Sequence, residues 1–191
     1  MEKIPLVMTH ENLGSVPEYP LPEGYGTRLF RRGEGRLWAE IETEAGEFDT
    51  TDQGFAQFEK EFVPFIDDFV RRCLLLEDHD GAAVGTATAW YSSVPDPHNA
   101  DFQDASWGRL HWVGICGSQQ GQGLGKPLVS ATLRLLTELG HKRAYLTTQT
   151  TSMRAIKMYL DFGFAPHVKS ALGVLGWKMV AEELGRPGLL K

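Results

Sequence analysis

The residues most suggestive of chemistry form a glycine-rich run between a strand-like and a helix-like segment. The run follows the apolar stretch at residues 110–116 and opens a helical pattern; it reads Gln120-Gly121-Gln122-Gly123-Leu124-Gly125. Glycines at alternate positions let successive backbone N–H groups point at one anion, and a helix start adds a favourable dipole. The run therefore predicts a site for a phosphorylated cofactor.

The spacing of the glycines disfavours two common nucleotide-binding loops. In a dinucleotide fingerprint that starts at Gly121, the last glycine would stand at Lys126. A Walker-type phosphate loop would need glycine at Gln120 and serine or threonine at Pro127. We therefore expect a different phosphorylated cofactor.

Hydrophobic patterning predicts the elements that position this run. Apolar or alternating stretches predict strands at residues 24–31, 72–77, 82–91, 110–116 and 144–148. Apolar residues at steps of three and four predict helices around 37–41, 55–69, 124–139 and 152–162, and the tail from 172 to 184 favours a C-terminal helix. The glycine run thus connects the fourth strand to the next helix.

Five phenylalanines share one side of the second predicted helix. They are Phe55, Phe58, Phe62, Phe65 and Phe69. Aromatic residues at helical spacing usually form core against a sheet, so a ligand groove is not expected here. Pro64 should kink or split this helix.

The composition is that of an ordinary globular protein. The chain has 191 residues, of which 42% are hydrophobic and 23% charged, and this length suits one domain. A net charge of −6 disfavours general nucleic-acid binding. Residues 1–20 carry three prolines and little periodicity, so we expect an N-terminal arm followed by a single domain at 21–191.

The cysteines and the apolar segments indicate the cellular compartment of the protein. Cys73 and Cys116 lie in strand-like stretches and are too few for a disulfide framework, so buried inert thiols are expected. The first 21 residues lack the apolar core of a signal peptide, and no run approaches membrane-spanning length. We expect a cytoplasmic protein with no membrane partner.

Two blocks of the sequence resemble the GNAT family of N-acetyltransferases. The Gln-x-x-Gly-x-Gly order at 120–125, with Val113-Gly114-Ile115 upstream, is similar to the acyl-CoA loop of that family. Ser152, Ala155, Tyr159, Gly163 and Phe164 stand at the spacing of its second block, where the family usually begins with asparagine. Together the blocks span residues 110–164.

The resemblance implies a mixed α/β fold. Its sheet would be twisted, mostly antiparallel and splayed between the fourth and fifth strands, with helices on both faces. The commonest pattern of the family ends in a strand that returns to the sheet, whereas this tail favours a helix. The cofactor would enter the splay, where unpaired strand edges can bind it.

The resemblance also implies which residues hold acetyl-CoA. The backbone of Val113 and Ile115 would pair with the pantetheine arm, and Gly114 between them suits a bulge. The loop facing the pyrophosphate comprises Gln120, Gly121, Gln122, Gly123, Leu124, Gly125 and Lys126. Ser152 and Ala155 would contact the cofactor from the following helix.

Tyr159 and His111 are the implied acid and base. A phenol can protonate the leaving thiolate of CoA, and Tyr159 matches the general acid of the family. By strand alternation His111 should share a face with Val113, and an imidazole can take a proton from an ammonium substrate. A structural, hydrogen-bonded histidine is an equal alternative for His111.

The reaction implied is direct transfer of an acetyl group from acetyl-CoA to a primary amine in a ternary complex. A ping-pong route through Cys116 is a minor alternative. A non-catalytic acyl-CoA-binding sensor or partner domain is a second hypothesis, against which Tyr159 weighs. The acceptor amine, the acyl chain and the oligomeric state stay open, although homodimers are common in the family.

The acceptor side of such enzymes varies, so its residues are harder to predict. Six carboxylates without a basic residue could attract a cationic amine, although a solvated face is commoner: Glu40, Glu42, Glu44, Glu47, Asp49 and Asp52. Weaker candidates are Trp90, Tyr91, Asp96, His98 and Asp101. No metal is expected, because the turn Asp78-His79-Asp80 offers too few spaced ligands.

Overall fold

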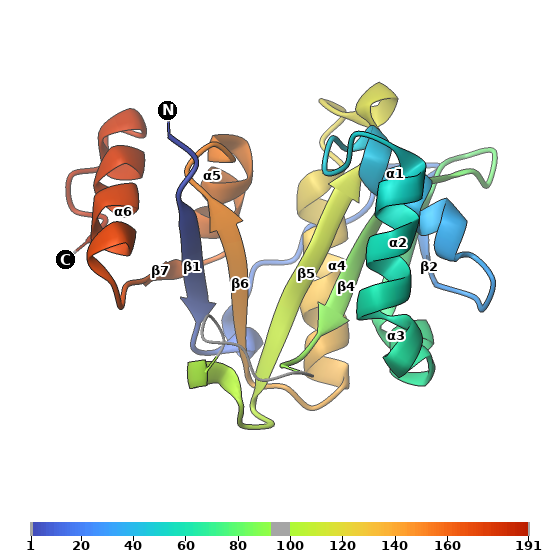
Figure 1. The fold of residues 1–191 in the computed structure, drawn as a ribbon, viewed down its shortest axis with the longest axis horizontal. Helices are drawn as coiled ribbons and strands as arrows, with labels where there is room; N and C mark the ends of the chain where they lie inside the picture. The colour runs from blue at the N-terminus through green and yellow to red at the C-terminus, as the bar shows by residue number, and fades with distance from the viewer. Residues whose placement is uncertain (1, 93–99, 191) are drawn as a thin grey trace.

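One sheet of seven strands, in the order β2-β3-β4-β5-β6-β1-β7, organises the computed structural model, which describes residues 2–92 and 100–190 (Figure 1). The strands are β1 (Pro5–His10), β2 (Gly26–Leu29), β3 (Cys73–Glu77), β4 (Ala83–Trp90), β5 (Trp107–Ile115), β6 (Arg143–Gln149) and β7 (Ala165–His167). Neighbouring strands are antiparallel except for the parallel pair β5 and β6. The predicted mixed, mostly antiparallel sheet is confirmed.

Helices cover both faces of this sheet (Figure 1). They are α1 (Gly35–Glu44), α2 (Thr51–Glu61), α3 (Ile66–Arg72), α4 (Gly125–Glu138), α5 (Met153–Asp161) and α6 (Ala171–Glu183). The helix predicted at 55–69 is split into α2 and α3 by a 3-10 turn at Val63–Phe65, because Pro64 cannot continue the α-helical hydrogen bonds. The predicted C-terminal helix is confirmed as α6.

Strands β5 and β6 pair over only a short length and then separate. Their pairing joins Trp107–Arg109 to Arg143–Tyr145, at the start of both strands. Beyond this point the two strands diverge, so the sheet opens into two halves (Figure 1). This confirms the predicted splay between the fourth and fifth strands of the sequence-based assignment.

Strand β1 corrects the expectation of an N-terminal arm. It pairs with β6 along its whole length, from Pro5 opposite Gln149 to His10 opposite Ala144, and with β7 on its other side. Leu6 and Met8 are 2% and 0% exposed. This alternation of buried side chains is short and begins at a proline, Pro5, which concealed the strand in the sequence.

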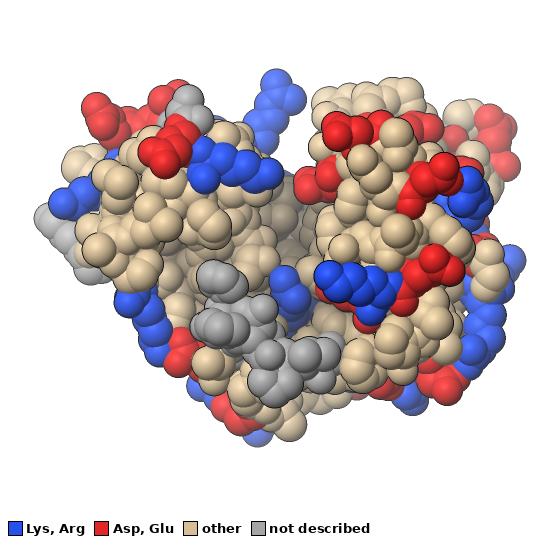
Figure 2. All heavy atoms as spheres, in the orientation of Figure 1, with Lys and Arg blue, Asp and Glu red and all other residues tan. Residues whose placement is uncertain are grey.

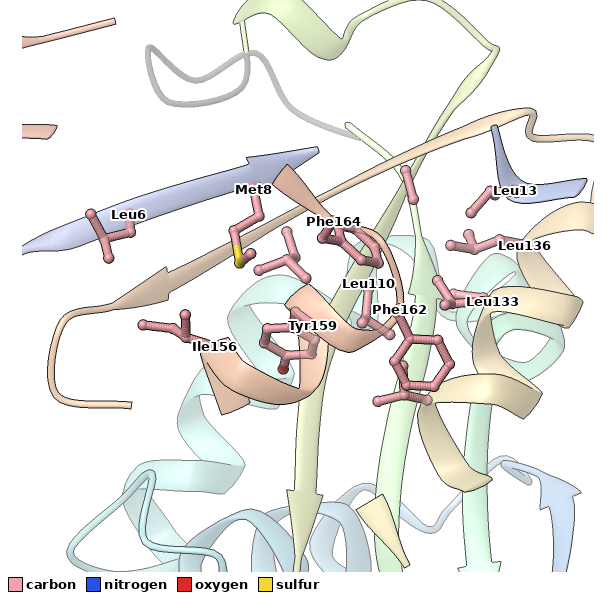
Figure 3. Close-up of a cluster of buried hydrophobic side chains, with 14 of the residues drawn as sticks. Leu6, Met8, Leu13, Leu110, Leu133, Leu136, Ile156, Tyr159, Phe162 and Phe164 are labelled. Atoms are coloured by element: carbon pink, nitrogen blue, oxygen red, sulfur yellow. The ribbon is translucent and has the colours of Figure 1, made fainter. Parts of the chain in front are cut away.

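Among the described residues, the two largest apolar cores lie between the sheet and the helices. One lies against α4, α5 and α6 and includes Tyr159, Phe162 and Phe164 (Figure 3). The other lies under α1, α2 and α3 and is largely aromatic. Phe58, Phe62 and Phe69 are at most 4% exposed in it, so the predicted core role of the phenylalanine stripe holds.

Candidate active site at the sheet splay

A cavity of about 380 Å³ lies where β5 and β6 diverge. It brings together five of the residues predicted for catalysis or cofactor binding: His111, Val113, Ser152, Ala155 and Tyr159. The space-filling view shows a hollow between the two halves of the molecule, with acidic side chains on the rim formed by α1 and the segment after it (Figure 2). Strands β5 and β6, helix α5 and the end of α1 therefore enclose one chamber.

A bulge in β5 decides which way its side chains point. Thr88 pairs with His111 and Thr86 with Gly114, so Trp112 and Val113 together face one residue of β4. Trp112 has a φ of 46°, a left-handed value that is uncommon outside glycine. The bulge therefore lies at Trp112 and Val113, one residue earlier than the position expected at Gly114.

This bulge overturns the prediction that His111 and Val113 share a face. His111 contacts Glu61 and Phe62 at the end of α2, whereas Val113 packs with the core beneath α4. Strict alternation would have placed both side chains on one side. The extra residue reverses the alternation, so His111 belongs to the α1–α2 wall of the cavity.

His111 is held by a carboxylate that the sequence reasoning missed. Its Nε2 lies 2.5 Å from Oε1 of Glu61, whose other oxygen accepts from Trp112 Nε1 at 3.1 Å and from Gln57 Nε2 at 2.8 Å. Burial favours a higher pKa for Glu61, but these hydrogen bonds and the His111 charge outweigh it and lower the pKa to about 2. Glu61 directly precedes Phe62 of the phenylalanine stripe, and nothing in that pattern pointed to a partner for His111.

The imidazole of His111 is uncharged near neutral pH. Burial and the charge of Arg109 lower its pKa to about 4, although Glu61 acts in the opposite direction. Because the Glu61 carboxylate carries no proton at neutral pH, the hydrogen between the two groups belongs to Nε2. Only Nδ1 then has a free lone pair, and it is a weaker base than an ordinary histidine.

Tyr159 lies at the border between the apolar core and the cavity. Its side chain packs beside Phe164, with ring centroids 6.1 Å apart, and its hydroxyl points away from Met8 (Figure 3). Burial raises the pKa of the phenol, and the charges of Glu47 and Glu42 raise it further. The phenol therefore keeps its proton into the alkaline range, as a proton donor must.

The glycine run has the geometry expected of an anion-binding loop. Gly121 and Gly123 have φ values of 82° and 78°, which L side chains rarely adopt. Helix α4 begins at Gly125, and the residue before it, Leu124, makes no side-chain cap. The first N–H groups of α4 are therefore open to a ligand oxygen.

The polar residues of the loop are partly engaged within the protein. Gln120 Nε2 donates to the Ile115 carbonyl at 3.0 Å, which ties the loop to the end of β5. Tyr25 donates to the side chain of Gln122 at 2.9 Å. Lys126 Nζ lies 3.0 Å from Asp161 of α5, so this lysine links α4 to α5.

The second sequence block lines the cavity from α5. Ser152, Ala155 and Tyr159 all face it, as their spacing predicts. The Ser152 hydroxyl does not cap α5, so it is available to a ligand. A Cβ on Gly125 would lie 3.2 Å from Met158 Sδ, which shows how closely α4 approaches α5 at the glycine run.

One carboxylate of the acidic segment at residues 40–52 differs from the others in its burial. Glu40, Glu44, Glu47, Asp49 and Asp52 are exposed, as a solvated face requires, although Glu47 also borders the cavity. Glu42 is 0% exposed and lines the cavity. It follows Trp38 by one helical turn on the buried face of α1, a pattern that could have separated it from its neighbours.

The weaker acceptor candidates lie elsewhere. Trp90 belongs to the aromatic core, Tyr91 donates to Asp68 at 2.7 Å, and Asp101 lies 3.2 Å from His167. Asp96 and His98 fall outside the described residues. None of these side chains whose position is described borders the cavity.

Residues 2–92 and 100–190 contain neither a membrane-spanning helix nor a cluster of metal ligands. No helix in these ranges is both long and apolar enough to cross a membrane. No group of three or more His, Cys, Asp or Glu side chains in the same ranges is arranged to hold a metal ion. A second hollow, of about 530 Å³, lies between His10 and Gly163 and contains none of the predicted site residues.

Known proteins resemble this chain in sequence and in fold. It is 29% identical over 167 residues to a mycothiol acetyltransferase of Frankia casuarinae, covering 81% of this chain and 45% of the relative. A GCN5-related N-acetyltransferase from Sphaerobacter thermophilus superposes with a TM-score of 0.63 at 22% identity, over 86% of this chain and 49% of the other. An aminoglycoside N-acetyltransferase, AAC(6')-Iy in complex with CoA, superposes with a TM-score of 0.58 at 17% identity, over 80% and 95% of the two chains.

The matches cover part of each curated relative and most of this chain. The chain spans about half the length of the curated relatives it matches. The model of the acetyltransferase (GNAT) family matches residues 36–164, which include the acidic segment, β5, the glycine run and the second block. The chain therefore belongs to the GNAT family of acetyltransferases.

Proposed function

We propose that the protein transfers an acetyl group from acetyl-CoA to a primary amine. The observation that carries this proposal is the cavity at the splay, where Val113, Ser152 and Tyr159 meet the acidic wall formed by Glu42 and Glu47. The wall with Val113, Ser152 and Tyr159 suits a thioester, and the acidic wall suits a cationic amine. The curated relatives, named as acetyltransferases, support the same reaction class.

The residues present fit the cofactor. The edge of β5 beyond Arg109 is not paired with β6, so its backbone can bind the pantetheine arm as an added strand would. The left-handed Gly121 and Gly123 and the uncapped start of α4 suit the pyrophosphate. Val113, Gly114, Ile115, Ser152 and Ala155 would flank the thioester.

In this proposal the amine attacks the acetyl carbonyl directly. The C–N bond forms, the C–S bond breaks, and Tyr159 protonates the leaving sulfur. Backbone N–H groups near Val113 and Gly114 steady the oxyanion. A covalent route through Cys116 is disfavoured, because burial and the charge of Glu44 raise the pKa of its thiol to about 12.

His111 has the position of a base but not the basicity of one. His111 lines the cavity, but its Nε2 is bonded to Glu61 and its pKa is about 4. A base with so low a pKa takes a proton from an ammonium group inefficiently at neutral pH. His111 is therefore one candidate base, and a stronger proton acceptor in the same cavity would compete with it.

The buried free thiols of Cys73 and Cys116 suit a reducing compartment, and we place the reaction in the cytoplasm. Titration calorimetry with acetyl-CoA tests cofactor binding. Turnover is then measured on an amine panel: spermidine, a free amino acid, kanamycin, a peptide with a free N-terminus and a lysine peptide. Binding without turnover supports the non-catalytic sensor instead, and no binding contradicts both hypotheses.

A further inference from the structure

The carboxyl group of Glu42 is buried in a way that the fold does not explain. Its side chain comes from α1 and is 0% exposed. Neither Oε1 nor Oε2 has a hydrogen-bond partner within residues 2–92 and 100–190. A buried carboxyl without partners costs stability, so its retention indicates a ligand that supplies the missing partner.

The backbone opposite Glu42 is shaped to admit this carboxyl. A Cβ on Gly114 would lie 2.8 Å from Glu42 Oε2 and 3.0 Å from its carboxyl carbon. Glycine at 114 therefore lets the carboxyl approach the stretch of β5 proposed to hold the acetyl group. The same cavity is lined by Val113 next to Gly114 and by Tyr159 on the opposite wall.

Charged and titratable groups surround Glu42 on several elements. They are Glu47 after α1, Cys73 on β3, Arg109 and His111 on β5, Cys116 after β5 and Tyr159 on α5. Burial raises the pKa of Glu42 well above its usual range, and the charge of Glu47 adds to this effect. Arg109 is directed to Thr147 and Tyr145, and no ion pair between Arg109 and Glu42 is present among the described residues.

We propose that Glu42 binds the ammonium group of the acceptor and accepts its proton during acetyl transfer. This inference rests on the proposed function and names the class of acceptor, a cationic primary amine. Two orphaned oxygens on the cavity wall can accept two of the three ammonium hydrogens. A carboxyl with a raised pKa is also a stronger proton acceptor than one in water.

The proton balance of the step is complete. The ammonium gives one proton to the Glu42 carboxylate, and the resulting neutral amine attacks the acetyl carbon. The tetrahedral adduct loses its second proton to solvent as the C–S bond breaks, and Tyr159 protonates the thiolate. Tyr159 and Glu42 then return to their starting protonation states by exchange with water.

The test compares Glu42→Gln with Glu40→Gln, an exposed position on the same helix. Glutamine keeps the shape of the side chain and removes its basicity. With the best cationic amine of the panel, we expect kcat/KM of Glu42→Gln to fall about 10²–10⁴-fold. The affinity for acetyl-CoA and the unfolding midpoint should each stay the same or increase. The Glu40→Gln protein should match the wild type.

Two further readouts distinguish a base from a structural residue. The acidic limb of the wild-type kcat/KM profile should be absent in Glu42→Gln but present in His111→Gln. Hydroxylamine, which is largely uncharged at neutral pH, needs no such deprotonation and should lose far less activity in Glu42→Gln. The Glu42→Asp protein, whose carboxyl group lies on a shorter side chain, should fold and should turn over slowly.

Several results would overturn this assignment. They are near-normal turnover in Glu42→Gln, an equal loss with hydroxylamine and cationic amines, or an acidic limb that disappears only in His111→Gln. If neither Glu42→Gln nor Glu42→Asp folds, the carboxyl serves the fold and the proposal fails. A wild-type protein that acetylates no amine contradicts the proposed function itself, whereas an active wild type with an equally active Glu42→Gln contradicts only the role of Glu42.

Discussion

Nε2 of His111 lies 2.5 Å from Oε1 of Glu61, and this contact joins two packed elements, β5 and the last turn of α2. The contact exists because the bulge at Trp112 turns His111 toward the helices. It holds the imidazole in one orientation and leaves Nδ1 as its unprotonated nitrogen. The pair therefore acts first as a fixed part of the cavity wall.

This pair should make stability depend on pH in a defined window. The pKa of His111 is about 4 in the folded protein and near 6.5 when unfolded, so the unfolded chain binds more protons between these values. Stability should be complete above about pH 6.5 and fall by about 3 kcal/mol as the pH drops to 4. Urea unfolding of His111→Gln should show a flatter profile there, while the exposed-site variant His79→Gln should follow the wild type. Equal slopes in all three proteins would show that His111 titrates normally.

Glu42 should make the stability of the folded protein depend on pH in the opposite direction. Its pKa is raised in the folded protein, so the wild type loses stability as the pH rises from about 4.5 toward the folded pKa. Relative to Glu42→Gln, this loss should reach up to about 1.4 kcal/mol per pH unit. Thermal or urea unfolding between acidic and mildly alkaline pH measures the difference, with Glu40→Gln as the control. A difference that does not change with pH would mean that Glu42 is ionised in the free protein.

Replacement of Tyr159 by phenylalanine should separate chemistry from binding. The ring packs in the core, so Tyr159→Phe should fold as the wild type does, and acetyl-CoA affinity should change little. Turnover should fall about 10²–10⁴-fold because the sulfur loses its proton donor. Tyr91→Phe, at a phenol outside the cavity, serves as the control. Unchanged turnover at every pH would remove Tyr159 from the mechanism.

The left-handed glycines of the loop should govern cofactor affinity. Alanine at Gly121 or Gly123 costs about 1–2 kcal/mol in this conformation, so we expect the Kd for acetyl-CoA to rise about tenfold. Gly33 has a φ of 94° and lies before α1, away from the loop. The Gly33→Ala protein is therefore a control that introduces the same kind of backbone strain outside the glycine run. Calorimetric titration of the three variants decides the point. Equal affinities would mean that the cofactor phosphates lie elsewhere.

Strand β1 should be essential to the fold. Met8 is 0% exposed in the main core, so Met8→Ala should lower the free energy of unfolding by about 2–5 kcal/mol. Lys3→Ala, at an exposed position just before the strand, should have little effect. Urea denaturation measures both. Similar stabilities would indicate that β1 adds little to the sheet.

Much of the fold could be predicted because its signals are local. Helical periodicity gave α4 and α5, and the glycine run marked the turn from β5 to α4. Strand β1 was missed because its partners, β6 and β7, lie more than a hundred residues away in the sequence, and an alternation of only six residues beside prolines is weak evidence.

The α5 side of the cavity could be predicted from the sequence, and its α1–α2 side only in part. Ser152, Ala155 and Tyr159 share one helix face, which spacing alone determines. The contact of His111 with Glu61 depends on one extra residue in β5, and a bulge cannot be read from side-chain types at a position occupied by tryptophan. The burial of Glu42 depends on which face of α1 meets the sheet beside Gly114, a fact of tertiary packing.

The position of β1 also has a mechanical consequence. The chain begins in the half of the sheet that contains β6 and β7, crosses to the half formed by β2 to β5, and returns through α4. Two covalent crossings therefore connect the halves (Figure 1). These two segments and the short β5–β6 pairing limit how far the halves can move apart, and so how widely the slot between them can open.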